Sequence, residues 1–218
     1  MSLNKTYAVF GLGRYGYSVA KELINSGAEV IAVDKDPNVV NYVAEEIPVC
    51  KCADVTDPEV IERLGIADVD IVITAMAENL ESSVMAITLC KEAGVKTVIS
   101  KCSSEMHRKI MLQVGADKAV FPECESGIRL AKNLLSSGFV DMMELSRGVS
   151  MIELEVKPQW IGKPLSDLHL RKKYSINVVA IKENDTVSTN ITAETVFTEN
   201  TKLIVIADTD KLNKLIRD

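Results

Sequence analysis

The stretch Tyr7-Ala8-Val9-Phe10-Gly11-Leu12-Gly13-Arg14-Tyr15-Gly16 decides the fold of this chain. Its first four residues form an apolar run typical of a buried strand, and three glycines with the spacing GxGxxG follow directly. Glycines at this spacing let a strand turn tightly into a helix and let backbone amides approach a pyrophosphate at the positive helix N-terminus. The stretch therefore predicts a strand, a turn and a helix that together bind an adenine nucleotide.

The residues around the glycines complete the expected βαβ unit. Apolar residues recur at helical spacing after the turn, at Val19, Ala20, Leu23 and Ile24. Asp34 ends the next apolar run, about 20 residues beyond the glycines, where this motif places an acid that accepts hydrogen bonds from the ribose hydroxyls. Asp34 could instead cap a helix that begins at Pro37, but the glycine spacing independently predicts a ribose-binding acid. A carboxylate here also repels a 2′-phosphate, which disfavours NADP.

Composition narrows the class of protein. The chain has 218 residues, of which 47% are hydrophobic and 26% charged, as in an ordinary globular protein large enough for two modest domains. Its net charge of -6 argues against a nucleic-acid partner. No apolar stretch is long enough to span a bilayer and no signal-peptide pattern opens the chain, so we expect a cytoplasmic protein. The five cysteines include no CxxC pair and indicate neither a disulfide framework nor a zinc site.

The first part of the chain alternates strand and helix patterns, which predicts a Rossmann-like, doubly wound α/β fold with a parallel sheet. The predicted strands are Tyr7–Phe10, Val30–Val33, Val49–Lys51, Asp70–Thr74, Thr97–Ser100 and Lys118–Phe121. The predicted helices between the later strands are Asp57–Leu64, Asn79–Ala93 and Ser103–Val114. Asp57 followed by Pro58 is a helix start, and Gly65, Gly94 and Gly115 mark the helix ends.

A longer amphipathic helix over 123–138 follows the sixth strand, and the pattern changes after it. Strands are predicted at Ser150–Val156, Ile176–Lys182, Asp185–Val187 and Leu203–Ala207, with short helices at Leu165–His169 and Lys211–Ile216. This is the pattern of a small α+β domain. We therefore expect a nucleotide-binding domain over 1–138, which includes the crossover helix, and a C-terminal domain over 139–218, with the boundary between Gly138 and Gly148.

Three charged residues near the predicted carboxyl edge of the sheet are further candidates. Arg14 lies inside the glycine loop, where its guanidinium could hold a β- or γ-phosphate or could simply be solvated. Asp54 follows the third strand and either meets the adenine or ribose or has no ligand role. Glu123 opens the crossover helix, where the helix dipole alone would stabilise it, or it holds a divalent cation against nucleotide phosphates.

No catalytic constellation emerges from the remaining residues. The two histidines, His107 and His169, fall in different predicted domains without a partner motif. A nucleophile elbow and a Walker lysine are both missing. We therefore expect a protein that is not an enzyme.

These motifs together resemble the potassium-transport regulators of the TrkA/KtrA type, which consist of an RCK N-terminal and an RCK C-terminal domain. The resemblance covers nearly the whole chain. It rests on Ala8–Gly16, Val33-Asp34, Leu64–Asp70, Gly115-Ala116-Asp117, and Phe121-Pro122-Glu123 followed by Gly127–Ala131. The Gly-Arg-aromatic-Gly form resembles the KtrA branch, in which the corresponding arginine reaches the terminal phosphates of ATP.

The resemblance implies a regulatory subunit at the inner face of the membrane. Such subunits pair through the crossover helix, assemble as octameric gating rings, and dock on a membrane potassium channel subunit of the TrkH/KtrB type. ATP and ADP favour different ring shapes, and some members bind NAD(H). The residues implied to bind the nucleotide are Gly11, Leu12, Gly13, Arg14, Tyr15, Gly16, Asp34, Lys35, Asp54, Val55, Ala75, Lys101 and Glu123. Glu123 would also take part in binding Mg²⁺ or Ca²⁺.

Some family members also bind cyclic di-AMP in the C-terminal domain. The segment Leu170–Ile181 resembles that binding segment, with Arg171 available for phosphate and Asn177 for base or ribose. The same segment is otherwise a helix end that leads into a strand. Two other functions stay open from the sequence: a small NAD-dependent oxidoreductase, and an RCK-type regulator of another ion transporter.

Overall fold

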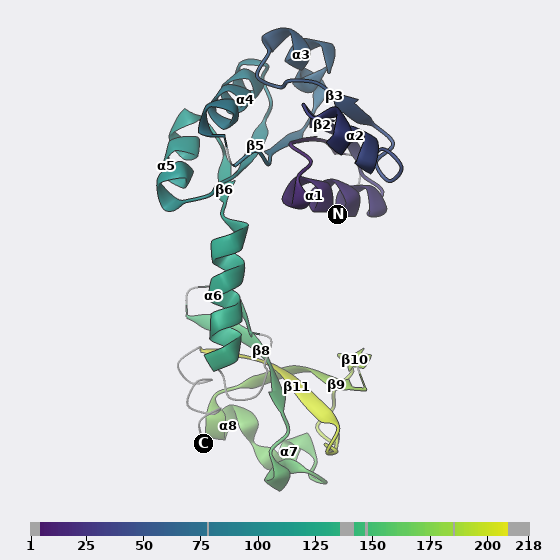
Figure 1. The fold of residues 1–218 in the computed structure, drawn as a ribbon. Helices are drawn as coiled ribbons and strands as arrows, with labels where there is room; N and C mark the ends of the chain where they lie inside the picture. Colours follow the sequence, from purple (N-terminus) through teal and green to yellow (C-terminus); the bar gives the residue numbers. More distant parts are fainter. Residues whose placement is uncertain (1–4, 78, 136–141, 147, 185, 209–218) are drawn as a thin grey trace. The chain divides into compact units, whose positions relative to one another are not determined.

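The computed structural model describes residues 5–77, 79–135, 142–146, 148–184 and 186–208 (Figure 1). The chain divides into two compact units, Met1–Cys124 and Glu125–Asp218. This division falls within helix α6 (Pro122–Leu135), whereas the sequence predicts a domain boundary after residue 138. No helix in the described ranges is both long and apolar enough to cross a bilayer.

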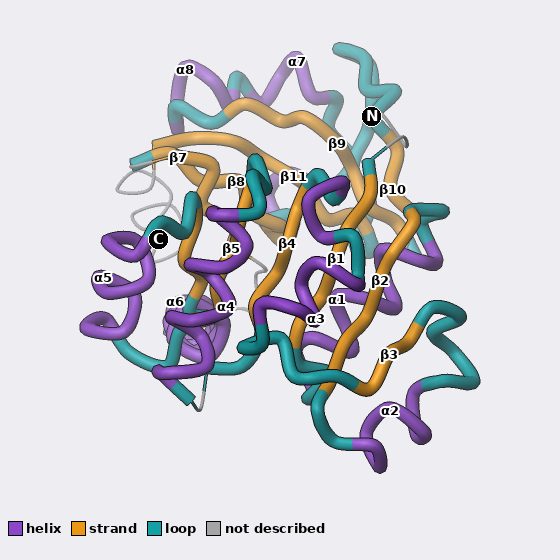
Figure 2. The backbone as a smooth tube through the Cα atoms, turned by 90° about the horizontal axis from the view of Figure 1, so that it is seen from above, coloured by secondary structure: helices purple, strands orange, loops and turns teal. Residues whose placement is uncertain are grey.

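The first unit is built on a parallel sheet with the strand order β3-β2-β1-β4-β5-β6. The strands are β1 (Thr6–Phe10), β2 (Glu29–Asp34), β3 (Cys50–Cys52), β4 (Ile71–Thr74), β5 (Thr97–Lys101) and β6 (Lys118–Val120). The helices are α1 (Arg14–Asn25), α2 (Pro37–Val43), α3 (Pro58–Arg63), α4 (Leu80–Glu92) and α5 (Glu105–Val114), with a short 3-10 helix at Ile66–Asp68. Figure 2 shows β1 between β2 and β4, so the direction of winding reverses beside β1. The predicted doubly wound fold is confirmed.

Each face of this sheet has its own hydrophobic core, because side chains alternate along a strand. Val9 points into the cluster that includes Ala20 of α1 and Val43 of α2. Its neighbours in β1, Ala8 and Phe10, belong to the cluster that contains α3, α4 and α5 residues. The strands are covered on both sides, which explains why they read as nearly continuous apolar runs.

Side-chain caps fix the starts of the helices. Asp57 accepts a hydrogen bond from the Glu59 N–H at 2.9 Å, so the predicted cap at Asp57 is confirmed. Asn79 caps α4 through the Ser82 N–H, and the helix proper starts at Leu80. The cap of α5 is Ser104, one residue later than the predicted start of this helix. Capped starts were predictable because the capping chemistry is local.

The second unit holds an antiparallel sheet with the strand order β10-β9-β11-β8-β7. Its elements are β7 (Met142–Ser146), β8 (Val149–Glu155), a 3-10 helix at Pro158–Trp160, α7 (Leu165–Leu168), α8 (Leu170–Tyr174), β9 (Asn177–Glu183), β10 (Thr186–Ser188) and β11 (Thr201–Asp208). Trp160, Phe197 and Leu203 are buried in its core. The predicted α+β architecture of this part is therefore confirmed.

Three elements of this unit lie outside the predicted strands and helices, namely β7, the 3-10 helix at Pro158–Trp160 and α8. β7 lies in the segment that the sequence predicts as the domain boundary, and it pairs antiparallel with β8. Gly148, with a φ of +87°, belongs to the connection between these strands and is not a linker glycine. Helix α8 lies in the segment Leu170–Ile181, for which the sequence offers a helix end that leads into a strand as the alternative to a ligand site. The predicted helix Lys211–Ile216 and residues 136–138 of the predicted crossover helix lie outside the described residues.

Gly16 and Gly13 allow a test of what the glycine turn requires. A Cβ on Gly16 would lie 1.9 Å from the Gly11 carbonyl oxygen, whereas a Cβ on Gly13 would meet nothing within 4 Å. We expect Gly16→Ala to lower the free energy of unfolding by about 2–3 kcal/mol through overpacking, measured by urea denaturation. Gly13→Ala is the matched control and should cost less than about 1 kcal/mol, as at a helix N-cap. Equal losses would contradict the close approach.

Candidate functional site

The glycine turn lies at the carboxyl ends of β1 and β4, where the strand order reverses and open α/β sheets bind their ligands. Gly11 has a φ of +86°, and its N–H donates to the Val33 carbonyl oxygen at 2.8 Å. A Cβ on Gly11 would lie 2.7 Å from Met76 Cγ. A side chain at this position would therefore be both strained and crowded.

The first turn of α1 is open to an anion. Gly13 is the N-cap of this helix and makes no side-chain capping bond. The first N–H groups of a helix lack partners within the helix and carry the positive end of its dipole. Because the space beside Gly13 is empty, a phosphate can approach these amides closely.

Asp34 holds the turn from the neighbouring strand. Its Oδ2 accepts from the Leu12 N–H at 2.6 Å, and its Oδ1 accepts from the Asp36 N–H at 2.9 Å. Asp36, and not Asp34, caps the helix that begins at Pro37, by accepting from the Asn38 N–H. The helix-cap interpretation of Asp34 is therefore wrong. Each carboxylate oxygen keeps acceptor capacity that a ribose hydroxyl could use.

A cavity of about 910 Å³ opens over this turn, within the size range of ligand pockets. Most of the predicted nucleotide-binding residues line it, namely Gly11, Gly13, Arg14, Tyr15, Asp34, Lys35, Asp54, Val55, Ala75, Lys101 and Glu123. Leu12 and Gly16 do not. Both are buried and shape the turn, Leu12 through its bond to Asp34 and Gly16 by its close approach to Gly11.

The sequence did not indicate several other lining residues, which are Ser18, Val33, Ala53, Met76, Ala77, Asn79 and Ser82. Part of this set could have been found. Met76 and Ala77 follow β4, and the carboxyl ends of both strands at the switch point line the crevice. Asn79 and Ser82 lie at the start of α4 and carry no ligand motif.

Two lysines and an arginine supply positive charge to the cavity. Arg14 and Lys35 are exposed, whereas the side chain of Lys101 is 18% exposed. Lys101 Nζ lies 2.7 Å from Glu123 Oε1 and 5.6 Å from the centre of the Tyr15 ring. The hydrogen bond from Lys101 holds the pKa of Glu123 below its usual value. Glu123 is therefore ionised at neutral pH and lies against a cation.

Asp54 is oriented by the threonine two residues further on. Its Oδ1 accepts from the Thr56 hydroxyl at 2.7 Å and from the Thr56 N–H at 3.0 Å. These bonds, with the charge of Lys35, lower the pKa of Asp54. Asp54 therefore presents a fixed, ionised carboxylate at the end of the cavity beyond β3.

A preformed metal site is not found among the described residues, where no group of three or more His, Cys, Asp or Glu side chains is placed to hold an ion. Glu123 is a single carboxylate paired with Lys101. A divalent cation at Glu123 would thus need most of its oxygen ligands from elsewhere, for which phosphate oxygens are suited.

The second unit brings Arg171 and Asn177 together. They line a cavity of about 360 Å³ with Leu165, His169, Leu170, Lys172, Ile176 and Val178. His169 and Ser175, at the two ends of α8, have positive φ values of 48° and 57°. The left-handed backbone at these two residues bounds a short basic helix beside the start of β9, and apolar side chains line the cavity next to it.

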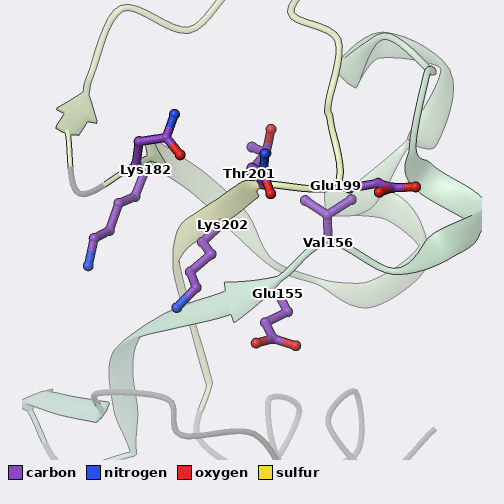
Figure 3. A pocket seen from close by; sticks show the side chains of 8 residues that line it. Glu155, Val156, Lys182, Glu199, Thr201 and Lys202 are labelled. Atoms are coloured by element: carbon purple, nitrogen blue, oxygen red, sulfur yellow. The ribbon is translucent and has the colours of Figure 1, made fainter.

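Another cavity of about 360 Å³ lies at the ends of β8, β9 and β11 (Figure 3). Lys182 and Lys202 border it, and both contact Glu153, with Nζ to carboxylate distances of 3.3 and 2.8 Å. Figure 3 shows Glu155 and Glu199 pointing in different directions, so they form no carboxylate pair. Paired cross-strand charges of this kind stabilise a sheet surface.

The fold and the first cavity define a Rossmann-type nucleotide-binding unit followed by a small α+β domain. Residues 7–122 match the model of the TrkA-N domain, and residues 149–218 match that of the TrkA-C domain. The chain therefore belongs to the TrkA family, and the predicted resemblance is confirmed.

Known relatives extend this similarity over nearly the whole chain. The Ktr system potassium uptake protein C of Bacillus subtilis is 36% identical to this chain, and the alignment covers 97% of this chain and 96% of the relative. The Ktr system potassium uptake protein A of Vibrio alginolyticus is 34% identical and covers 97% of both. The solved GsuK channel bound to NAD, 16% identical, has the same fold with a TM-score of 0.65, over 95% of this chain and 38% of the GsuK chain.

Thr56→Val tests how Asp54 is held. This change removes the hydroxyl donor and leaves the Thr56 N–H, so we expect the pKa of Asp54 to rise toward the usual value of about 3.9. A carboxyl whose pKa is lowered in the folded state stabilises the fold above its unfolded pKa, and this contribution is lost as the pH falls through the folded value. NMR titration of the carboxyl carbon measures the shift. Thr56→Ser, which keeps the hydroxyl, should leave the pKa low, and an unmoved pKa in the valine variant would contradict the assignment.

Proposed function

We propose that this chain is the nucleotide-sensing regulatory subunit of a potassium uptake system. The observation that carries the proposal is the cavity over the glycine turn, in which Asp34, Arg14 and Lys101 line one space in a chain of the TrkA family. Relatives over nearly its whole length are named as potassium uptake proteins. An RCK-type regulator of another ion transporter would share the fold, but these relatives favour potassium.

The ligand we propose is ATP or ADP. Asp34 would accept the ribose hydroxyls, the amides at the start of α1 would hold the first phosphates, and Asp54 would lie on the adenosine side. Arg14 would then meet the terminal phosphates, for which a guanidinium offers two parallel donors, and Lys101 would meet the γ-phosphate of ATP. NAD(H) would use the same ribose and pyrophosphate positions, and the structural neighbour GsuK is described as bound to NAD.

Regulation by such a ligand needs no catalytic step. A nucleotide that binds one conformation more tightly than another shifts the population by that difference in affinity and no more. We therefore propose that the protein is not an enzyme and that it transmits nucleotide occupancy to its transporter. Glu123 would contribute one ligand to a Mg²⁺ or Ca²⁺ ion, and nucleotide phosphates would supply others.

The crossover helix α6 supports a proposal of self-association. Ile128, Leu130 and Leu134 on this helix are 52%, 60% and 64% exposed. Leu130 and Leu134 lie one turn apart and so share a face of the helix, and neighbouring exposed apolar side chains favour contact with another protein surface. We propose that α6 belongs functionally with residues 1–138, that it pairs two chains, and that dimers form an octameric ring. The ring would lie in the cytoplasm against a membrane channel subunit of the TrkH/KtrB type.

The cavity beside α8 supports a second ligand in the C-terminal domain. Arg171, Lys172 and Asn177 line it together with apolar side chains. This combination suits a phosphate and a purine base. We propose that cyclic di-AMP binds here.

A thermal-shift panel with ATP, ADP, NAD, NADH and cyclic di-AMP, with and without Mg²⁺ or Ca²⁺, tests the proposed function through the stabilisation that a bound ligand confers. We expect ATP and ADP to raise the melting temperature. Arg14→Ala should weaken ATP binding about tenfold, the loss expected for one hydrogen bond to a charged group, and ADP binding less.

Arg63→Ala is the matched control, because Arg63 is exposed on α3 and does not line the cavity. It removes the same charge and should leave both affinities unchanged. Equal losses for ATP and ADP in Arg14→Ala would count against the arginine assignment. Preferential stabilisation by NADH, with substrate-dependent loss of its absorbance, would favour the oxidoreductase alternative and contradict the regulator.

Arg171→Ala tests the proposed cyclic di-AMP site. Loss of a charge-assisted hydrogen bond to phosphate should weaken binding at least about tenfold by calorimetry. Lys173→Ala, a change on the same helix outside the cavity, should have little effect. Similar losses in the two variants would indicate general electrostatic attraction, and no binding by the unaltered protein would refute the site.

A further inference from the structure

The ion pair between Lys101 and Glu123 lies at the edge of the nucleotide cavity, and both residues line it. Lys101 is the less exposed partner, at 18% against 62% for Glu123. Its ammonium group lies between the Glu123 carboxylate at 2.7 Å and the face of the Tyr15 ring at 5.6 Å. Lys101 is therefore held in place by two groups, each of which attracts a cation.

This arrangement affects any anion that enters the cavity. An ammonium group is a compact point charge that binds either a carboxylate or a phosphate, so the two anions can compete for it. Arg14, the other cation at the glycine turn, has an exposed side chain, whereas Lys101 already contacts an internal anion. A phosphate that reaches Lys101 must therefore displace Glu123 or share the lysine with it.

We propose that Glu123 acts as an internal competitor of the terminal phosphate of the nucleotide for Lys101. The proposal rests on the proposed function, since it assumes that a nucleotide occupies the cavity. In this proposal the γ-phosphate of a triphosphate takes Lys101 from Glu123, and the freed carboxylate then holds a divalent cation against the same phosphates. A diphosphate leaves the ion pair intact. The ion pair thus makes the cavity respond to the number of phosphates, and it does so at the first turn of α6.

Glu123→Gln tests this competition, because it removes the negative charge and keeps the shape of the side chain. Without divalent cations, in EDTA, calorimetry should show ATP bound about three- to five-fold more tightly by the variant, consistent with the modest strength of partly exposed ion pairs. ADP affinity should stay within about twofold of the unaltered protein. With Mg²⁺ present, the variant should lose the additional ATP affinity that the unaltered protein gains from the ion.

Two variants separate the competition from a general charge effect. Glu125→Gln removes an acid from the same helix that does not line the cavity, and it should not strengthen ATP binding. Lys101→Met combined with Glu123→Gln should abolish the gain, because the lysine that Glu123→Gln releases is then absent. A gain in Glu125→Gln, or one that persists without Lys101, would overturn the proposal.

The remaining outcomes are also decisive. If Glu123→Gln weakens ATP binding in EDTA or leaves it unchanged, while the unaltered protein binds ATP, the competition is refuted and the proposed function stands. If the unaltered protein binds no ATP under either condition, both are refuted.

Discussion

The hydrogen bond from the Leu12 N–H to Asp34 Oδ2, 2.6 Å long, is the interaction on which the geometry of the nucleotide cavity depends. It ties the turn after β1 to the end of β2, while the Gly11 N–H binds the Val33 carbonyl oxygen one residue earlier. The contact of Gly16 with the Gly11 carbonyl closes the same turn from the helix side. Two glycines, Gly11 and Gly16, and one carboxylate thus fix where α1 starts, and so where its free amides face.

The charges of the cavity are arranged at its two ends. Asp54, held by Thr56, keeps a carboxylate beyond β3, and Lys101 lies between Glu123 and Tyr15 near the end of β5. In the proposed complex, Asp54 would repel the phosphates of the nucleotide, which would orient the ligand along the edge of the sheet with its phosphates away from β3. This ordering follows from the strand order, because β3 and β5 lie on opposite sides of the switch point between β1 and β4.

The sequence predicts those features of the fold and site that depend on residues close together in the chain, and it misses those that depend on contacts between distant residues. Residue spacing was enough to predict the glycine turn, the cap at Asp57 and the residues that follow each strand. Most of the predicted nucleotide-binding residues line one cavity. By contrast, the Asp34 carboxylate serves the turn and not a helix cap, and only the paired register of β1 and β2 reveals this. The sequence does not predict β7, because Met143 and Leu145 are exposed and do not form the pattern of a buried strand. Gly148, which lies in the connection to β8, resembles a linker glycine in sequence. The Lys101–Glu123 contact could not be predicted from the sequence either, because it joins the end of β5 to the start of α6.

That contact also bears on how a sensor can respond without catalysis. A ligand shifts a conformational equilibrium only through different free energies of interaction with the two states. A cavity of fixed donors would bind ATP and ADP in one conformation and would transmit little. In the proposed competition, the partner of Glu123 would depend on which phosphates are present, and Glu123 lies on the first turn of α6. The same helix exposes Ile128, Leu130 and Leu134 to possible partners. The residue proposed to lose its lysine to a phosphate is therefore part of the helix proposed to contact another chain.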